Sequence, residues 1–120
     1  MTGKEALEKG IRDAVSFEPF FIVNGQAAEV KGTGGGLNPR TVIGQRKDGA
    51  VLLLVIDGRQ VNSLGASYKD CMDVMLEHGA YNAANLDGGS SSVLVYQDKI
   101  ITNCSSLYGP RDTPTAFVVK

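Results

Sequence analysis

The sequence predicts an α/β (α+β) fold, a mixed β-sheet with packed helices in a single domain. Three observations support this prediction. The chain has 120 residues, the size of one domain. Its apolar content of 42% is enough for a hydrophobic core. In its second half, short apolar runs alternate with a helical pattern, which is typical of strands joined by a helical crossover.

The first third of the chain predicts a helix and then a hairpin. Thr2 and Glu5 have the spacing of a capping box, and apolar residues then recur at helical spacing as far as Val15. The dipeptide Asn24-Gly25 after an apolar run is a strong hairpin signal. The expected elements are a helix over about 3–15, a buried strand over 20–23, a returning strand over 26–30 and a glycine-rich loop over 32–38.

The remaining chain predicts further strands around one helix. The run 50–56 has no polar alternation, so we expect a central strand that is covered on both faces. Ser67 and Asp70 open the helix, and Gly79 ends it after His78, whose place at a helix C-terminus indicates no catalytic role. The expected elements are a helix over 67–78 and strands over 41–45, 50–56, 83–86, 92–96, 99–102 and 115–119.

Composition and charge exclude several classes of protein. The formal net charge of −1 provides no attraction to nucleic acid or to an anionic membrane. No run of about eighteen apolar residues is present, so no membrane insertion is expected, and the first residues lack the apolar region of a signal peptide. Cys71 and Cys104 fit neither a disulfide framework nor a zinc site, and Cys71 is expected in the core. The compartment stays open.

Two aspartates follow two of the expected strands. Asp57 ends the run 50–56 and Asp87 ends the run 83–86, and the helix between these runs is long enough to make them parallel neighbours. Both acids are then expected at the same edge of the sheet, where open α/β sheets bind ligands. Taken alone, Asp57-Gly58 is a common turn dipeptide. The two glycines after Asp87 exceed what a hairpin needs and permit close approach of a ligand to the backbone.

Five motifs occur in a characteristic order: "NPRTVIG" from Asn38, "VIDGR" from Val55, "SLGAS" from Ser63, "NLDGGSSS" from Asn85 and "RDTPTA" from Arg111. This set resembles the phosphodiester glycosidase family, which includes the animal lysosomal uncovering enzyme. The resemblance covers about residues 20–120 and is strongest to bacterial members, often linked to exopolysaccharide. Family domains carry more sheet before this part, so the chain looks like the C-terminal portion of the domain.

The resemblance implies hydrolysis of a glycosyl-1-phosphodiester at its glycosidic bond. Carboxylates suit the acid, base or nucleophile roles of such a reaction. Guanidinium groups grip phosphate oxygens, and backbone N–H groups with serine hydroxyls can cradle an anion. The expected catalytic residues are Asp57 and Asp87, and the expected substrate-binding residues are Arg40, Arg59, Gly88, Gly89, Ser90, Ser91 and Arg111.

Other interpretations stay open at this stage. The chain could be an inactive carbohydrate-binding or interface module of the same family, or a homo-oligomer that completes its sheet with a neighbour. No cofactor is expected, although Asp57 and Asp87 could bind a divalent cation. The implied partner is a carbohydrate phosphodiester, with no nucleic acid. The resemblance suggests an extracellular or cell-envelope location for a full-length protein.

Overall fold

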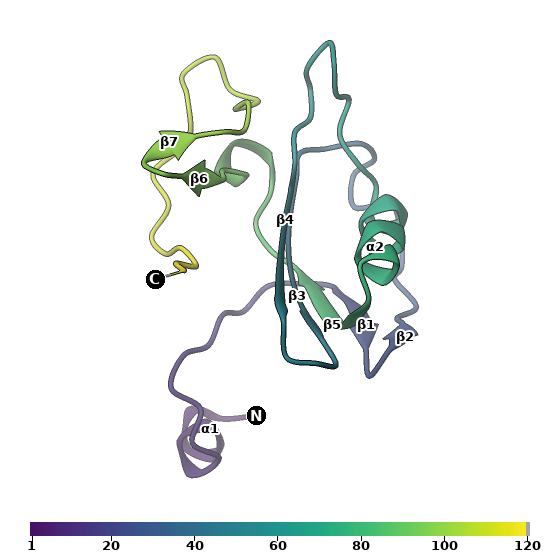
Figure 1. The fold of residues 1–120 in the computed structure, drawn as a ribbon, viewed down its shortest axis with the longest axis vertical. Helices are drawn as coiled ribbons and strands as arrows, with labels where there is room; N and C mark the ends of the chain where they lie inside the picture. Colours follow the sequence, from purple (N-terminus) through teal and green to yellow (C-terminus); the bar gives the residue numbers. More distant parts are fainter. Residues whose placement is uncertain (120) are drawn as a thin grey trace.

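The computed structural model describes residues 1–119 and confirms the α+β class. Its main sheet has five strands in the order β2-β1-β5-β3-β4, and β6 and β7 form a separate hairpin. Figure 1 shows α2 beside the main sheet and the β6–β7 hairpin on the other side of β3 and β4. The elements are α1 Gly3–Glu8, β1 Phe20–Val23, β2 Gln26–Ala27, β3 Arg40–Arg46, β4 Val51–Ile56, α2 Tyr68–Glu77, β5 Ala80–Asn85, the 3-10 helix η1 Gly89–Ser91, β6 Val95–Tyr96 and β7 Lys99–Ile100.

The position of β4 differs from the prediction. The run 50–56 was expected at the centre of the sheet, but β4 is an edge strand and β3 lies between β4 and β5. Both of these pairs are antiparallel, as is every other neighbouring pair of the sheet, so the sheet is antiparallel and not mixed as predicted. β4 and β5 do run in the same direction, yet they are separated by one strand. The reason is the short turn at Lys47–Gly49, which pairs β4 with β3 before the crossover begins.

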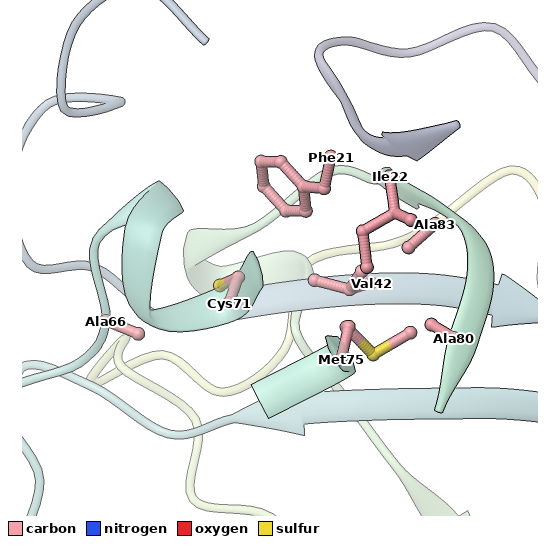
Figure 2. Packing of buried hydrophobic residues seen from close by; sticks show 8 residues of the cluster. All are labelled: Phe21, Ile22, Val42, Ala66, Cys71, Met75, Ala80 and Ala83. Carbon is pink, nitrogen blue, oxygen red and sulfur yellow. The ribbon is translucent and has the colours of Figure 1, made fainter. Parts of the chain in front are cut away.

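The hydrophobic core lies between the sheet and α2 (Figure 2). Alternation along β4 turns Leu52, Leu54 and Ile56 toward this core, whereas Val51 and Leu53 are 60% and 41% exposed. An unbroken apolar run thus marks a strand that is covered on one face only. The buried cluster consists of Phe21, Ile22, Val42, Ala66, Cys71, Met75, Ala80 and Ala83.

The expected position of Cys71 in the core is confirmed. It is fully buried on the inner side of α2, and this burial raises the pKa of its thiol to about 11. The thiol is therefore neutral at physiological pH and behaves as a small apolar side chain.

Several expected elements are shorter than predicted. The capping box of α1 is present, but the helix ends at Glu8 because Gly10 has a φ of +73°, and it buries none of its residues. The hairpin at Asn24-Gly25 is confirmed by φ angles of +52° and +78°. The expected strands over 26–30, 92–96 and 99–102 contract to two residues each, and the segment 115–119 forms no strand. No helix within residues 1–119 has the length and apolar character that crossing a membrane requires.

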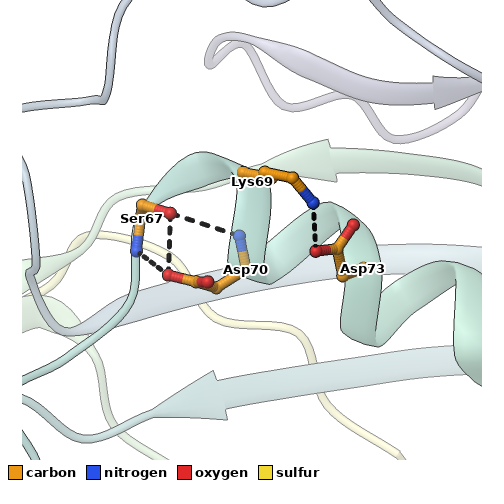
Figure 3. A network of polar contacts seen from close by, with 4 residues as sticks. All are labelled: Ser67, Lys69, Asp70 and Asp73. Atoms are coloured by element: carbon orange, nitrogen blue, oxygen red, sulfur yellow. Dashed lines mark hydrogen bonds and ion pairs between the residues drawn. The ribbon is translucent and has the colours of Figure 1, made fainter.

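Helix α2 begins and ends where the sequence predicts. The Ser67 side chain accepts from the Asp70 N–H, and the Asp70 carboxylate accepts from the Ser67 N–H and hydroxyl, which completes a capping box (Figure 3). These hydrogen bonds from Ser67 hold the pKa of Asp70 below its usual range. At the other end, His78 is the C-cap, and its Nδ1 lies 2.9 Å from the Val74 carbonyl oxygen.

Candidate functional site at three strand ends

The beginning of β3 and the ends of β4 and β5 meet in one tightly packed place. A Cβ on Gly58, just after β4, would lie 2.6 Å from the Pro39 nitrogen. A Cβ on Gly88, just after β5, would lie 2.7 Å from the Pro39 carbonyl oxygen. The Gly89 N–H also donates to that oxygen at 3.1 Å. Only glycine permits this contact on both sides of Pro39, so the two glycines bring the three strand ends together.

Asp57 and Asp87 consequently flank the first residues of β3. Ile56 is paired with Arg40, and the Leu86 N–H donates to Thr41 O, so each acid directly follows a residue held against β3. One strand separates them, which places their backbones about 9–10 Å apart. Both acids therefore lie at the same end of the strands, as expected, although β3 separates β4 from β5.

The two carboxylates have different surroundings. Asp57 is partly buried, and its oxygens accept from the backbone and side-chain N–H groups of Asn103 at 3.0–3.1 Å. Asp87 is exposed and makes no hydrogen bond or ion pair with a described residue. Within residues 1–119, neither acid belongs to an ion pair. The Asp87 carboxylate is therefore accessible and has no partner among the described residues. The Asp57 carboxylate, in contrast, holds the segment after β7.

Arg40 is almost fully buried at the start of β3. Its Nε donates to Ala66 O, and its Nη2 donates to Gly34 O and Gly36 O, each at 2.8 Å. The guanidinium carbon also lies 4.6 Å from the centre of the Tyr68 ring. Arg40 thereby fastens the glycine-rich loop to the start of α2. Its predicted grip on phosphate could use only Nη1, which has no partner among the described residues.

Arg59 lies on the exposed surface beside Asp57. Its φ of +56° is in the left-handed region, which a residue with a side chain avoids at a cost of about 1–2 kcal/mol. Its Nη2 donates to the Asn38 side-chain oxygen at 2.7 Å, so the side chain points toward the start of β3. Asn38 is itself held by two backbone hydrogen bonds with Ala66. Residues in such sparsely populated backbone conformations cluster at functional sites, which makes Arg59 a candidate for a functional role.

The turn after Asp87 forms the short helix η1. The N–H groups of Gly89, Ser91 and Ser92 are engaged by Pro39 O, Gly88 O and Gly89 O. Of the predicted anion cradle, the N–H groups of Gly88 and Ser90 are left without a partner among the described residues. The Ser91 hydroxyl is buried and has no partner there either. The cradle stays a prediction, and these two N–H groups are the ones that can serve it.

The backbone of Arg111 lies beside the short helix η1. Its N–H donates to Ser90 O at 3.4 Å, and its exposed side chain makes no hydrogen bond or ion pair with a described residue. The predicted charged residues, three arginines and two aspartates, carry a formal charge of 3 − 2 = +1.

Sequence reasoning missed the residues that hold this site together. Asn38 orients Arg59, and Gln60 donates to the Cys104 carbonyl oxygen at 2.9 Å. Asn103, whose backbone and side-chain N–H groups donate to the Asp57 carboxylate, was not among the predicted site residues. Asn38 was detectable in principle, because it lies inside a predicted motif next to Pro39.

Two shallow hollows lie elsewhere on the described chain. One of about 380 Å³ is bordered by Val30 and α2, and the other of about 320 Å³ lies over Phe20, Ile43 and Val51 on the sheet face away from α2. Neither hollow is lined by a predicted site residue. Among residues 1–119, no group of three His, Cys, Asp or Glu side chains is placed to hold a metal ion.

The chain is an α+β domain, and aspartate, arginine and glycine residues lie where β3 begins and where β4 and β5 end. The sequence profile of the phosphodiester glycosidase family matches residues 1–120. The chain belongs to the phosphodiester glycosidase family, as the motif resemblance predicted.

The chain spans only a small part of the length of each of the following three relatives. The SPbeta prophage-derived uncharacterized protein YomE of Bacillus subtilis (strain 168) is 34% identical over an alignment of 103 residues, and the match covers 82% of this chain and 16% of that protein. The crystal structure of a putative exported protein from Burkholderia pseudomallei K96243 has a TM-score of 0.60 and 43% identity over 62% of this chain and 14% of that one. A hypothetical protein from Synechocystis shares the fold, with a TM-score of 0.61, 24% identity and coverage of 73% and 18%.

The packing of Gly88 yields a direct test of the site's construction. Gly88→Ala should cost about 1–3 kcal/mol in the free energy of unfolding, because the new Cβ would meet the backbone oxygen of Pro39. Gly3→Ala is the control, since a Cβ there meets nothing within 4 Å. Urea unfolding compares the two variants. Equal midpoints would show that β3 and β5 are not in contact at Pro39.

Proposed function

We propose that this chain carries the strand-end part of a site that hydrolyses a glycosyl-1-phosphodiester at its glycosidic bond. One observation supports this most: Gly58 and Gly88 pack on either side of Pro39, and Asp57 and Asp87 directly precede these two glycines. Arg59 lies two residues after Asp57 and donates to the Asn38 side chain, and the Arg111 N–H donates to Ser90 O. Membership of the phosphodiester glycosidase family supports this class of reaction.

The chemistry of the bond fits these residues. A phosphate monoester anion is a good leaving group, so the demand on the protein is to hold the diester and to stabilise an oxocarbenium-like centre. In our proposal Asp87, the exposed carboxylate, acts on the sugar or on the attacking water. Arg59 and Arg111 hold the phosphate, with the N–H groups of Gly88 and Ser90 as further donors. Asp57 holds Asn103 and the segment that leads to Arg111.

The test is hydrolysis of a panel of sugar-1-phosphodiesters by this chain and, in parallel, by the full-length Burkholderia pseudomallei protein. Turnover by both proteins would support the proposal in full. Binding without turnover by this chain, with turnover by the longer protein, would favour the inactive carbohydrate-binding module. Neither binding nor turnover by either protein would overturn the proposal.

Arg111→Lys tests the phosphate-binding role. We expect kcat/KM to fall by roughly 10-fold or more, because an ammonium group cannot reproduce the two parallel hydrogen bonds of a guanidinium. Arg12→Lys is the matched control, since Arg12 is exposed and lies outside the site. An equal effect of the two changes on kcat/KM would remove Arg111 from the proposed site.

A further inference from the structure

The two edges of the main sheet differ sharply. The β2 edge consists of two residues, Gln26–Ala27, and is too short to serve as a template for another strand. The β4 edge consists of six residues, Val51–Ile56, and all six are apolar. Natural sheets protect long edges with charged residues, proline or a bulge. β4 has none of these, and its register with β3 is continuous.

The unpaired backbone groups of this edge can be assigned. The Arg46 N–H donates to Ala50 O, so alternation directs the even-numbered residues of β4 toward β3. On the other side of β3, the Leu86 N–H donates to Thr41 O. The backbone groups of odd-numbered residues in β3 therefore point toward β5, which agrees with even-numbered residues of β4 bonding to β3. The N–H and C=O groups of Val51, Leu53 and Val55 therefore face outward along the open edge.

We propose that β4 is a docking edge for β4 of a second copy of this chain, which would join the two sheets across a two-fold axis. An antiparallel pair of identical strands is the pairing that a two-fold axis generates. No charged side chain lies between Gly49 and Ile56, so identical strands meet without like-charge repulsion. The net charge of −1 adds little repulsion between whole copies.

The outward groups also fix the register. Hydrogen-bonded pairs must be formed between outward-facing residues, and the register in which Val51, Leu53 and Val55 all pair with one another places Leu53 opposite the partner's Leu53. The exposed side chains of Val51 and Leu53 are then covered by their counterparts. This register brings the partner's Gly49 opposite Asp57, so the turn of one copy borders the strand-end site of the other.

Sedimentation equilibrium and amide hydrogen exchange of the full chain test this inference without any assay of activity. We expect a dimer, with exchange at Val51, Leu53 and Val55 that slows as protein concentration rises. Leu53→Lys should weaken dimerisation by at least roughly 10-fold, because a charge on an edge strand opposes pairing. Leu107→Lys, at a fully exposed leucine outside the sheet, should leave the dimer unchanged.

Three outcomes would overturn the inference. The first is a monomer at every concentration with rapid exchange at the three amides. The second is slow exchange that does not depend on concentration, which would show that a segment of the same chain covers the edge. The third is a dimer that Leu53→Lys leaves intact, which would place the interface elsewhere.

Discussion

Asp87→Asn should lower turnover of a glycosyl phosphodiester by about 10²–10⁴-fold, the usual contribution of a positioned acid or base. The fold should be unaffected, because Asp87 is exposed and makes no hydrogen bond or ion pair with a described residue. Steady-state kinetics and urea unfolding of the same preparation separate the two effects. Asp57 offers a less direct test, since its carboxylate also holds Asn103.

Asp13→Asn is the matched control for this change. Asp13 is also exposed, and it lies between α1 and β1, outside the site. Its substitution should leave both turnover and stability unchanged. An Asp87→Asn variant that kept wild-type turnover would remove Asp87 from the chemistry.

Met75→Ala should cost about 2–5 kcal/mol in the free energy of unfolding, because Met75 is 2% exposed and its loss leaves a cavity between α2 and the sheet. Leu53→Ala should cost less than about 1 kcal/mol, because the Leu53 side chain is 41% exposed on the outer face of an edge strand. Urea unfolding at a protein concentration where the chain is monomeric measures both values. Equal costs would show that the core does not lie between α2 and the sheet.

The contrast between Met75 and Leu53 shows how far the sequence predicts the fold. Helical spacing and the Ser67–Asp70 capping box located α2 because these signals are local. The apolar run of β4 was assigned to the centre of the sheet because a continuous run is typical of strands covered on both faces. Strand order depends on which strands pair over long separations, and β5 pairs with β3 rather than with β4. No local pattern in the sequence encodes that choice.

The placement of the two aspartates was predictable, but the contacts of the predicted site residues were not. Asp57 and Asp87 were placed at one edge of the sheet from the direction of two strands, and that reasoning needed no knowledge of the strand between them. The contacts of Arg40 were beyond reach, because they depend on how the glycine-rich loop folds back over Tyr68. A sequence motif does not show whether the guanidinium of its arginine binds a ligand or the backbone of a loop.

The most direct test of the central proposal is the fate of oxygen from water in the reaction. Hydrolysis of a glycosyl-1-phosphodiester in ¹⁸O-labelled water, followed by ³¹P NMR of the phosphate product, shows which bond is broken. Cleavage of the glycosidic bond delivers the water oxygen to the sugar, so our account predicts a phosphate monoester without label. A labelled phosphate would show attack at phosphorus and would contradict the assignment of this site to glycosidic cleavage.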